Sequence, residues 1–383
     1  MTLKSLPPWG AQIVQGTIAL RGPKRSEDRW REASDRGNKE DNLDSMDIAV
    51  IGSGSWGIAL ARRLWKNGAN VTIWARSRES AEKLKINRED KDKLPGVIID
   101  GSIKITDNME DALRDKDMIV VTVPSVAIRE VCEKMKPFLA NEDDRHQIIV
   151  NCAKGIESDT LMLMSDVILD VLPGSDVAVL SGPSHAEEVG KDLPTTIVVS
   201  AFSKESAKAV QDAFMADTFR VYTSPDMLGI EIGAALKNVI ALAAGVCDGL
   251  GYGDNAKAAL ITRGIAEMSR LGAAMGGDYE TFSGLSGIGD LVVTCASMHS
   301  RNRRAGILIG QGKTVEEATG EVKMVVEGVN SAAAALELAK KYEVEMPIVE
   351  QVNEVLFGGK SAKDAVVDLM SRDKKDENDL QGW

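Results

Sequence analysis

Three glycines that lie between an apolar segment and an amphipathic one constrain the fold of this chain more than any other feature. Residues 47–51, DIAVI, predict a β-strand, and residues 56–67 predict a helix. Between them, Gly52, Gly54 and Gly57 have the spacing G-x-G-x-x-G. The first glycine permits a tight turn, the second lets the backbone approach a pyrophosphate, and the third lets the helix pack against the strand. Between a strand and a helix, this spacing predicts a dinucleotide-binding α/β unit. An unliganded turn is the alternative.

Apolar segments continue to alternate with helical ones as far as Ser224. The further strand candidates are residues 70–74, 117–124, 146–155, 176–184, 194–201 and 219–224. Short apolar strands that alternate with helices predict a parallel sheet covered by helices on both faces. We therefore expect an α/β fold with a Rossmann-like, doubly wound, mainly parallel sheet over residues 46–224.

The pattern changes to helices alone after Ser224. That serine, Pro225 and Asp226 suit the N-cap, the first residue and the first-turn carboxylate of a long helix. Further helix candidates are residues 256–275, 301–311, 329–342 and 347–357. The sequence therefore predicts an all-α C-terminal domain over residues 225–372, followed by a flexible tail over 373–383.

The composition limits the classes of function. A chain of 383 residues is too long for one ordinary core. A formal net charge of −12 and an aromatic content of 4% argue against a nucleic-acid partner. Four cysteines without a C-x-x-C pair predict reduced thiols in a cytosolic protein, and no histidine or cysteine spacing predicts a metal site. No apolar run approaches the length of a membrane span, so no integral membrane segment is expected.

The first 45 residues differ from the rest of the chain. Residues 1–25 contain basic but no acidic side chains, and the residues after them mix both signs. Three interpretations are open: a disordered extension, a transit peptide for an organelle, or translation that starts at Met46. Without targeting, we expect a cytoplasmic location.

The end of the second predicted strand bears on the choice of cofactor. Sites selective for NAD usually carry an acidic residue there. Here the segment TIWARSRES has no carboxylate at the strand end, and Arg76 and Arg78 follow it. An arginine at this place can pair with a 2′-phosphate, so we expect NADPH to be accepted. The alternative, above all for Arg78, is an ordinary surface charge.

Lys237 is surrounded by small and apolar residues in GAALKNVIALAAG. Its neighbours on one helix face are Gly233, Ile240, Ala241 and Ala244. Burial of an unpaired ammonium is costly. If another helix packs here, the lysine needs a carboxylate partner. If a cleft lies here, desolvation lowers its pKa and suits it to donate a proton. A side chain that reaches solvent is also open.

Two further segments follow strand candidates at the edge where open α/β sheets bind ligands. Lys154 in NCAKG is either a ligand contact or a solvated side chain. In SGPSHAEE, His185 is either catalytic or a capping and packing residue.

The C-terminal half contributes two candidate segments. GLSGIGDLVVTC contains Asp290 and Thr294. SRNRR begins a helix in which a Ser300 cap, free N–H groups and Arg301 could bind a phosphate, and a solvated basic helix start is the alternative.

In this order, GSGSWG, NCAKG, SGPS, ALKNVIALAAG, NAKAALITRGIAEM, GLSGIGDLVVTC and SRNRR closely resemble the bacterial-type NAD(P)-dependent sn-glycerol-3-phosphate dehydrogenases. The resemblance covers roughly Asp47 to Asp376. It implies reversible reduction of dihydroxyacetone phosphate to sn-glycerol 3-phosphate with NADPH or NADH, which feeds glycerophospholipid synthesis. We expect a homodimer. The alternatives are a related two-domain dehydrogenase for another small carbonyl or imine, and a non-catalytic dinucleotide sensor.

The resemblance also implies roles for individual residues. Lys237 would accept the proton in alcohol oxidation and donate it in reverse, with Lys154 and Asp290 also catalytic. The implied cofactor contacts are Gly52, Gly54, Ser55, Trp56, Gly57, Arg76, Lys154, Ala186, Arg301, Val325 and Glu327. The implied substrate contacts are Lys154, Gly182, Ser184, Lys237, Asp290, Thr294, Ser300, Arg301 and Asn302. Many relatives carry threonine in place of Ser184, which keeps the hydroxyl. We further expect Asp290 to hold Lys237 in its charged state and Lys154 to stabilise charge on the substrate oxygen.

Overall fold

The computed structural model describes residues 45–139, 147–374 and 376–377. The predictions made for the extension over residues 1–45 and for the tail over 373–383 fall largely outside the described residues. The described residues pack as one compact unit.

The strand, loop and helix predicted at the start of the α/β part are confirmed. β1 (Asp47–Ile51) leads through the glycine loop into α2 (Ser55–Lys66), and β2 (Asn70–Trp74) follows. Successive side chains of β1 alternate between two hydrophobic clusters, one on each face of the sheet. Both faces are therefore covered, as expected for a parallel sheet.

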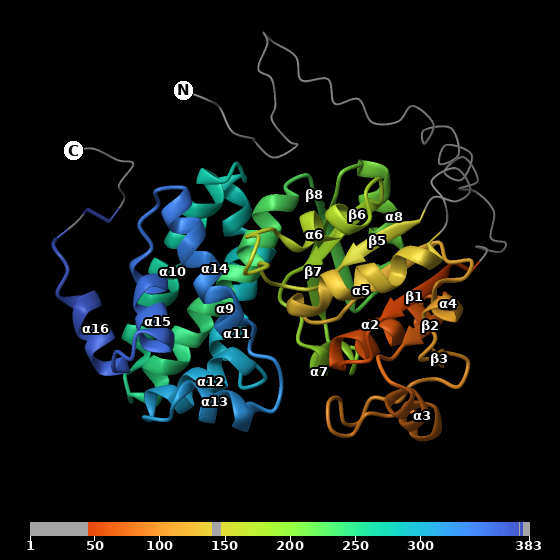
Figure 1. Cartoon of the computed structure of the whole chain (residues 1–383), viewed down its shortest axis with the longest axis horizontal. Coiled ribbons are helices and arrows are strands. Elements are labelled where there is room, and N and C mark those ends of the chain that lie inside the picture. Colours follow the sequence, from red (N-terminus) through yellow and green to blue (C-terminus); the bar gives the residue numbers. More distant parts are fainter. Residues whose placement is uncertain (1–44, 140–146, 375, 378–383) are drawn as a thin grey trace, which may run out of the picture. The chain divides into compact units, whose positions relative to one another are not determined.

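Among the described residues, the sheet has eight strands in the order β3-β2-β1-β4-β5-β6-β7-β8 (Figure 1). The remaining strands are β3 (Lys104–Thr106), β4 (Met118–Val121), β5 (Ile148–Asn151), β6 (Asp176–Ser181), β7 (Thr195–Ala201) and β8 (Phe219–Ser224). Neighbouring strands pair in parallel except β6 and β7, which are antiparallel. The mainly parallel, doubly wound sheet is confirmed, although β3 was not predicted. The strand order reverses between β1 and β4, which is where such sheets bind ligands.

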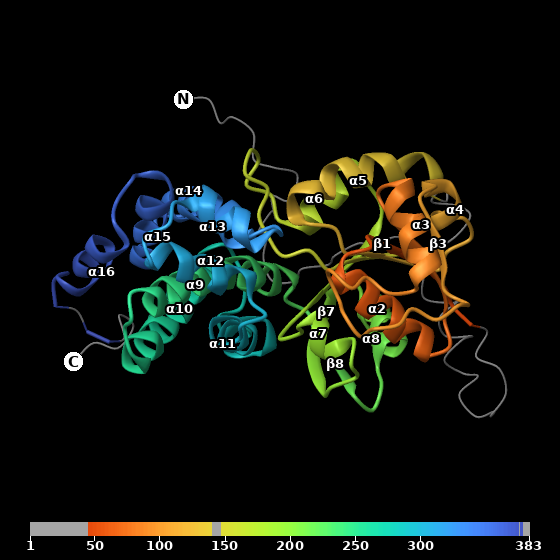
Figure 2. The same ribbon diagram turned by 90° about the horizontal axis from the view of Figure 1, so that it is seen from below.

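Helices cover both faces of this sheet. In Figure 2, α5 (Ile128–Met135) and α6 (Met164–Val171) lie above the sheet, and α2 and α8 (Lys204–Phe214) lie below it. The other helices of the α/β part are α3 (Arg78–Asn87), α4 (Met109–Leu113) and the short α7 (Ala186–Val189).

Helices without strands follow β8 in the described part of the chain, as expected. The central one is α9 (Met227–Gly249), around which most of the others pack (Figure 2). The others are α10 (Asp254–Ala274), α11 (Asp290–Ala296), α12 (Arg301–Gly310), α13 (Val315–Val322), α14 (Glu327–Lys341), α15 (Pro347–Phe357) and α16 (Ala362–Met370). The sequence did not predict α11, α13 or α16, which are short.

The small residues at the end of α9 serve helix packing. A Cβ atom on Gly245 would lie 2.1 Å from the carbonyl oxygen of Arg303. One on Gly306 would lie 2.1 Å from the carbonyl oxygen of Leu242. Only glycine therefore allows α9 and α12 to approach this closely, and α12 carries the predicted phosphate-binding segment at its start.

The predicted start of α9 was wrong by two residues. Ser224 is not an N-cap, because it is still the last residue of β8 and pairs with Ser200 of β7. The N-cap is Asp226, whose carboxylate accepts a hydrogen bond from the amide of Gly229 at 2.9 Å. The helix therefore begins at Met227.

α9 also corrects the expectation about apolar length. It has 23 residues, and an 18-residue window in it has a mean hydropathy of 1.6. By length and composition this helix could cross a membrane, so the statement that no apolar run approaches that length was wrong. Within the protein, 89% of the window is buried. The helix is the core of the helical part, which explains its composition.

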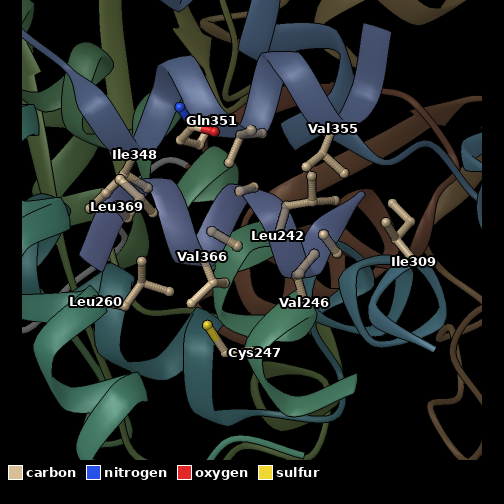
Figure 3. Close-up of a pocket in the computed structure, with 14 residues that line it drawn as sticks. Leu242, Val246, Cys247, Leu260, Ile309, Ile348, Gln351, Val355, Val366 and Leu369 are labelled. Carbon is tan, nitrogen blue, oxygen red and sulfur yellow. The ribbon is translucent and has the colours of Figure 1, made fainter. Parts of the chain in front are cut away.

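A small apolar cavity lies in the helical part, between α9, α10, α12, α15 and α16. Its volume is about 40 Å³, and Figure 3 shows Leu242, Val246 and Val355 among the side chains around it. Gln351 also lines it, but none of the predicted site residues does. The cavity is therefore separate from the candidate site.

Candidate active site

Lys237 projects from the middle of α9 into a buried cluster of polar groups. Its Nζ donates hydrogen bonds to Asp290 Oδ1 at 2.9 Å and to Thr294 Oγ1 at 2.8 Å. The other carboxylate oxygen of Asp290 accepts a hydrogen bond from Lys154 Nζ at 2.6 Å. The expected contact between Lys237 and Asp290 is thus confirmed. The structure adds that one carboxylate joins both lysines, although the three residues come from distant parts of the sequence.

Burial controls the electrostatics of this cluster, because Lys237 is 6% exposed and Asp290 is 2% exposed. Burial lowers the pKa of Lys237 to about 8. The positive charge of Lys154 also lowers this pKa, and the negative charge of Asp290 raises it. Burial alone would raise the pKa of Asp290, but the two ammonium groups outweigh it and the pKa is lowered. The cluster therefore holds an ionised carboxylate beside a lysine that can release its proton near neutral pH.

A glycine-rich turn places Asp290 within hydrogen-bond distance of Lys237 on α9. The turn Leu285–Gly289 precedes α11, and Asp290 is the first residue of that helix. A Cβ atom on Gly287 would lie 2.0 Å from the carbonyl oxygen of Phe282, so the turn requires glycine there. Thr294 lies one turn further along α11 and donates to the Asp290 carbonyl at 2.6 Å.

Lys154 reaches the cluster from the segment that follows β5. Its Nζ also donates to the carbonyl of Gly182 at 3.0 Å, and the hydroxyl of Ser184 donates to the same carbonyl at 3.0 Å. Gly182 has a φ of +132°, which disfavours other residues. Two of the implied substrate contacts, Lys154 and Ser184, therefore meet at the carbonyl of a third, Gly182.

The start of α12 has the predicted cap. The hydroxyl of Ser300 accepts a hydrogen bond from the amide of Arg303 at 3.2 Å. Arg301 is the first helical residue and donates to the carbonyl of Val325 at 3.1 Å. Burial lowers the pKa of Arg301, against the attraction of Glu327. A helix N-terminus and a largely desolvated guanidinium together suit a phosphate group.

Asn302, one of the implied substrate contacts, also contacts two other helices. Its side-chain amide donates to Asn238 Oδ1 at 2.9 Å, and its oxygen accepts from the amide of Gly328 at 2.8 Å. It therefore joins α9, α12 and the start of α14. Asn238, directly after Lys237, was not singled out from the sequence, since a contact between helices distant in sequence leaves no local pattern.

The glycine loop fits a dinucleotide at the end of β1. Gly52 has a φ of +123°, and a Cβ atom on Gly57 would lie 2.1 Å from the carbonyl oxygen of Gly52. A Cβ on Gly54 would meet nothing within 4 Å, which leaves space beside that residue for a ligand. Ser55 and Trp56 begin α2, whose N-terminus has no side-chain cap. The first N–H groups of α2 are therefore available to phosphate oxygens.

Four other predicted cofactor contacts lie on separate elements. Arg76 is exposed just after β2, and Ala186 is the first residue of α7. Val325 and Glu327 precede and begin α14. Of these, Val325 contacts Arg301 as described above.

Glu327, whose charge acts on Arg301, also contacts a residue that the sequence did not suggest. Its carboxylate accepts from the amide of Ser125 at 3.1 Å and from the Ser125 hydroxyl at 2.5 Å. Ser125 follows β4, at the point where the strand order reverses. Ser125 could have been predicted as a site residue from this position, because ligands bind beyond the ends of β1 and β4 in this topology.

His185 lies close to the cluster. Its Nε2 atom is buried and makes no hydrogen bond within the described residues. Burial lowers the pKa of the imidazole, and the charge of Lys237 lowers it further. No group of three or more His, Cys, Asp or Glu side chains in the described ranges could hold a metal ion.

Comparison with protein families gives a direct match. The model described as the N-terminus of NAD-dependent glycerol-3-phosphate dehydrogenase matches residues 47–207, and the model of its C-terminus matches residues 226–367. This chain belongs to the NAD-dependent glycerol-3-phosphate dehydrogenase family.

Relatives in the glycerol-3-phosphate dehydrogenase family match almost over their full length. Glycerol-3-phosphate dehydrogenase [NAD(P)+] of Fusobacterium nucleatum is 62% identical over 338 residues, which are 88% of this chain and 99% of the relative. The Agathobacter rectalis enzyme of the same name is 57% identical, with 88% of this chain and 99% of the relative covered. The crystal structure of glycerol-3-phosphate dehydrogenase from Coxiella burnetii is 35% identical, with a TM-score of 0.82, 86% of this chain and 99% of the other covered. The expected fold class and the NAD(P)-dependent oxidoreductase class are confirmed.

Proposed function

We propose that this chain catalyses the reversible reduction of dihydroxyacetone phosphate to sn-glycerol 3-phosphate with NADPH or NADH. Family membership supports the substrate, which the relatives carry in their names. The observation that carries the proposal is the buried cluster in which Asp290 contacts both Lys237 and Lys154. The product is the phosphorylated glycerol that glycerophospholipid synthesis consumes.

Lys237 acts as the proton donor in the direction of reduction. Burial lowers its pKa to about 8, so it is mainly protonated at neutral pH and can still release the proton. Asp290, at 2.9 Å, keeps the ammonium charged before substrate binds. In the direction of oxidation the neutral amine accepts the proton of the alcohol.

Lys154 stabilises the negative charge that develops on the C2 oxygen of the substrate. Its ammonium is held by Asp290 and by the carbonyl of Gly182, and its side chain is 19% exposed. A cation held in place before the reaction needs little reorganisation during it. This is an electrostatic role, separate from the proton transfer by Lys237.

The start of α12 binds the substrate phosphate. The N–H groups after Ser300 and the guanidinium of Arg301 offer positive charge away from the reacting carbon. Binding energy from this remote group orients the carbonyl toward the lysines.

The glycine loop and the N-terminus of α2 bind the cofactor pyrophosphate. When bound, the nicotinamide supplies the hydride that reduces C2. Arg76, exposed beside the loop, pairs with the 2′-phosphate of NADPH, so we propose that NADPH is preferred. Gly54 leaves room for the phosphates.

We further propose a cytoplasmic homodimer with a cofactor domain over residues 46–224 and a substrate domain over 225–372. The change from strands to helices after Ser224 supports the boundary. The four cysteines are all buried and free, as expected in a reducing compartment. Analytical ultracentrifugation tests the assembly, and mass spectrometry of the mature N-terminus tests whether residues 1–45 are retained.

The activity is tested by adding dihydroxyacetone phosphate to the protein with NADPH. The proposal expects loss of nicotinamide absorbance and formation of sn-glycerol 3-phosphate. Unphosphorylated dihydroxyacetone is the matched control and should react far more slowly. No loss of absorbance with the phosphorylated substrate, with folded protein that binds NADPH, would contradict the proposed reaction.

A further inference from the structure

Glu231 is a buried carboxylate that takes no part in the proposed chemistry. It lies on α9, six residues or about 1.7 turns before Lys237, and is 4% exposed. Its Oε1 accepts hydrogen bonds from the amide of Ser165 at 3.0 Å and from Asn151 Nδ2 at 3.2 Å, and its Oε2 accepts from the Ser165 hydroxyl. All three partners donate to it, which favours the ionised form, whereas burial opposes this and raises the pKa of the carboxyl to about 7.

One set of these bonds caps a helix of the α/β part. α6 begins after Leu163, whose side chain cannot cap it. Ser165 is the second residue of α6, so Glu231 takes the place of the missing cap from another helix. Negative charge at this end of α6 is also favourable to the helix dipole. Glu231 therefore ties α9 to the start of α6.

The remaining bond ties α9 to the turn that carries Lys154. Asn151 is the last residue of β5, and its side chain bonds both the amide and the carbonyl of Ala153, at 3.0 Å and 3.3 Å. These bonds shape the NCAKG turn, in which Lys154 comes next. The contact between Asn151 and Glu231 thus fixes the base of that turn against α9.

Two separate connections therefore join α9 to the end of β5 and the turn after it. One is the bond of Glu231 to Asn151, and the other is the pair of contacts that Lys237 and Lys154 make with Asp290. We propose that Glu231 is a positioning residue that holds the Lys154 turn against α9, so that both lysines meet at Asp290. This inference rests on the proposed function, because it assigns Lys154 a part in that reaction.

The variant Glu231→Gln tests the proposal. An amide has the same shape but carries no negative charge. The Ser165 hydroxyl must turn to accept from its N–H, and the bonds from Asn151 and the Ser165 amide lose their charge assistance and weaken. We expect kcat/KM for dihydroxyacetone phosphate to fall about tenfold to a hundredfold through displacement of Lys154. The Kd for NADPH should change much less than kcat/KM, because the glycine loop is not affected.

Glu267→Gln is the matched control. Glu267 is likewise buried, and its carboxylate caps α15 by accepting from the amides of Ile348 at 2.8 Å and Val349 at 3.3 Å. Burial raises the pKa of both glutamates to about 7. The control should lower the melting temperature to a similar degree while kcat/KM stays within about twofold. Equal losses of kcat/KM in the two variants would overturn the proposal.

A double-mutant cycle separates positioning from general destabilisation. If Glu231 acts through Lys154, Glu231→Gln should cause no further loss of kcat/KM in a Lys154→Ala background. The same fold-loss in both backgrounds would contradict the proposal. If Glu231→Gln does not fold, Asn151→Ala takes its place in the cycle, because it keeps the α6 cap. Wild-type kcat/KM in Asn151→Ala would then overturn the proposal.

A crystal structure of Glu231→Gln gives a readout that does not depend on activity. The proposal expects Lys154 Nζ to move away from Asp290 Oδ2, which it contacts at 2.6 Å in the unchanged chain. If Lys154 still contacts Asp290 in the variant, the positioning proposal is wrong, whether or not the proposed reaction is correct. If the wild-type protein is active and Glu231→Gln has the same kcat/KM, the positioning proposal is wrong while the proposed function stands.

Discussion

Lys237 and Asp290 form an ion pair in the interior of the protein, with Nζ 2.9 Å from Oδ1. Burial lowers the pKa of the lysine to about 8, and the carboxylate opposes that shift. Asp290 also pairs with Lys154 at 2.6 Å, so one carboxylate forms ion pairs with two ammonium groups. The cluster therefore keeps a net positive charge, which suits a site where negative charge develops on a substrate oxygen.

Replacement of Lys237 by alanine removes the proposed proton donor and leaves Asp290 paired with Lys154. Because the buried carboxylate keeps a cation, the variant should fold and bind NADPH with an unchanged Kd. We expect kcat to fall about 10²- to 10⁴-fold, measured by steady-state kinetics beside a fluorescence titration with NADPH. Turnover near that of the unchanged chain would remove Lys237 from the proton-transfer step.

Lys257→Ala is a matched control for this variant. Lys257 pairs with Asp248, near the end of α9, at 2.5 Å, and Asp248 also pairs with Arg303 at 2.7 Å. The control thus removes one of the two cations that pair with Asp248, as Lys237→Ala removes one of the two that pair with Asp290. Its kcat should stay within about twofold of the unchanged value.

Asp290→Asn tests the role of the carboxylate in keeping Lys237 charged. Without Asp290, burial and the repulsion of Lys154 both lower the pKa of Lys237 and nothing in the pair opposes them. The pH at which reduction loses half its kcat/KM should therefore fall by about one unit or more. An unchanged pH dependence would show that another group controls the charge state of the donor.

Arg301→Ala tests the phosphate site at the start of α12. Loss of a charge-assisted contact should raise KM for dihydroxyacetone phosphate about tenfold to a hundredfold with a smaller effect on kcat. Unphosphorylated dihydroxyacetone should react as with the unchanged chain. If both substrates are affected equally, Arg301 does not bind the phosphate. Kinetics with the two substrates at constant NADPH measure this.

The strands and most long helices could be predicted from the sequence because local patterns encode them. β1 and β2 agree with their predicted ranges, since continuous apolar segments bounded by turns are typical of buried parallel strands. The start of α9 was misplaced because Ser224 and Asp226 are both good caps, and only the pairing of β8 with β7 distinguishes them.

The candidate site was predictable in part. A carboxylate partner was one of the expectations for a buried Lys237, and Asp290 was the candidate that the family resemblance suggested. The contacts of Lys154 with Asp290, of Glu231 with Asn151 and of Glu327 with Ser125 were not. Each joins residues 80 or more positions apart, on elements whose docking no local pattern describes.

Arg76→Asp tests the choice of cofactor. The substitution places a carboxylate where an adenosine 2′-phosphate would pair with the exposed arginine, and a carboxylate there favours the ribose hydroxyls of NADH. The ratio of kcat/KM with NADPH to that with NADH should fall about tenfold or more. The exposed Arg78 serves as control, because its substitution should change the ratio much less. An unchanged ratio for Arg76→Asp would place the 2′-phosphate elsewhere.

The pH dependence of kcat/KM in both directions tests the central claim most directly. Lys237 must be protonated to donate during reduction and neutral to accept during oxidation, and burial lowers its pKa to about 8. We therefore expect kcat/KM for reduction to fall as the pH rises through about 8, and kcat/KM for oxidation to rise over the same range. Both inflections should be absent in Lys237→Ala. The same inflection in that variant, or profiles that change in the same sense in both directions, would contradict the assignment of Lys237 as the proton donor and acceptor.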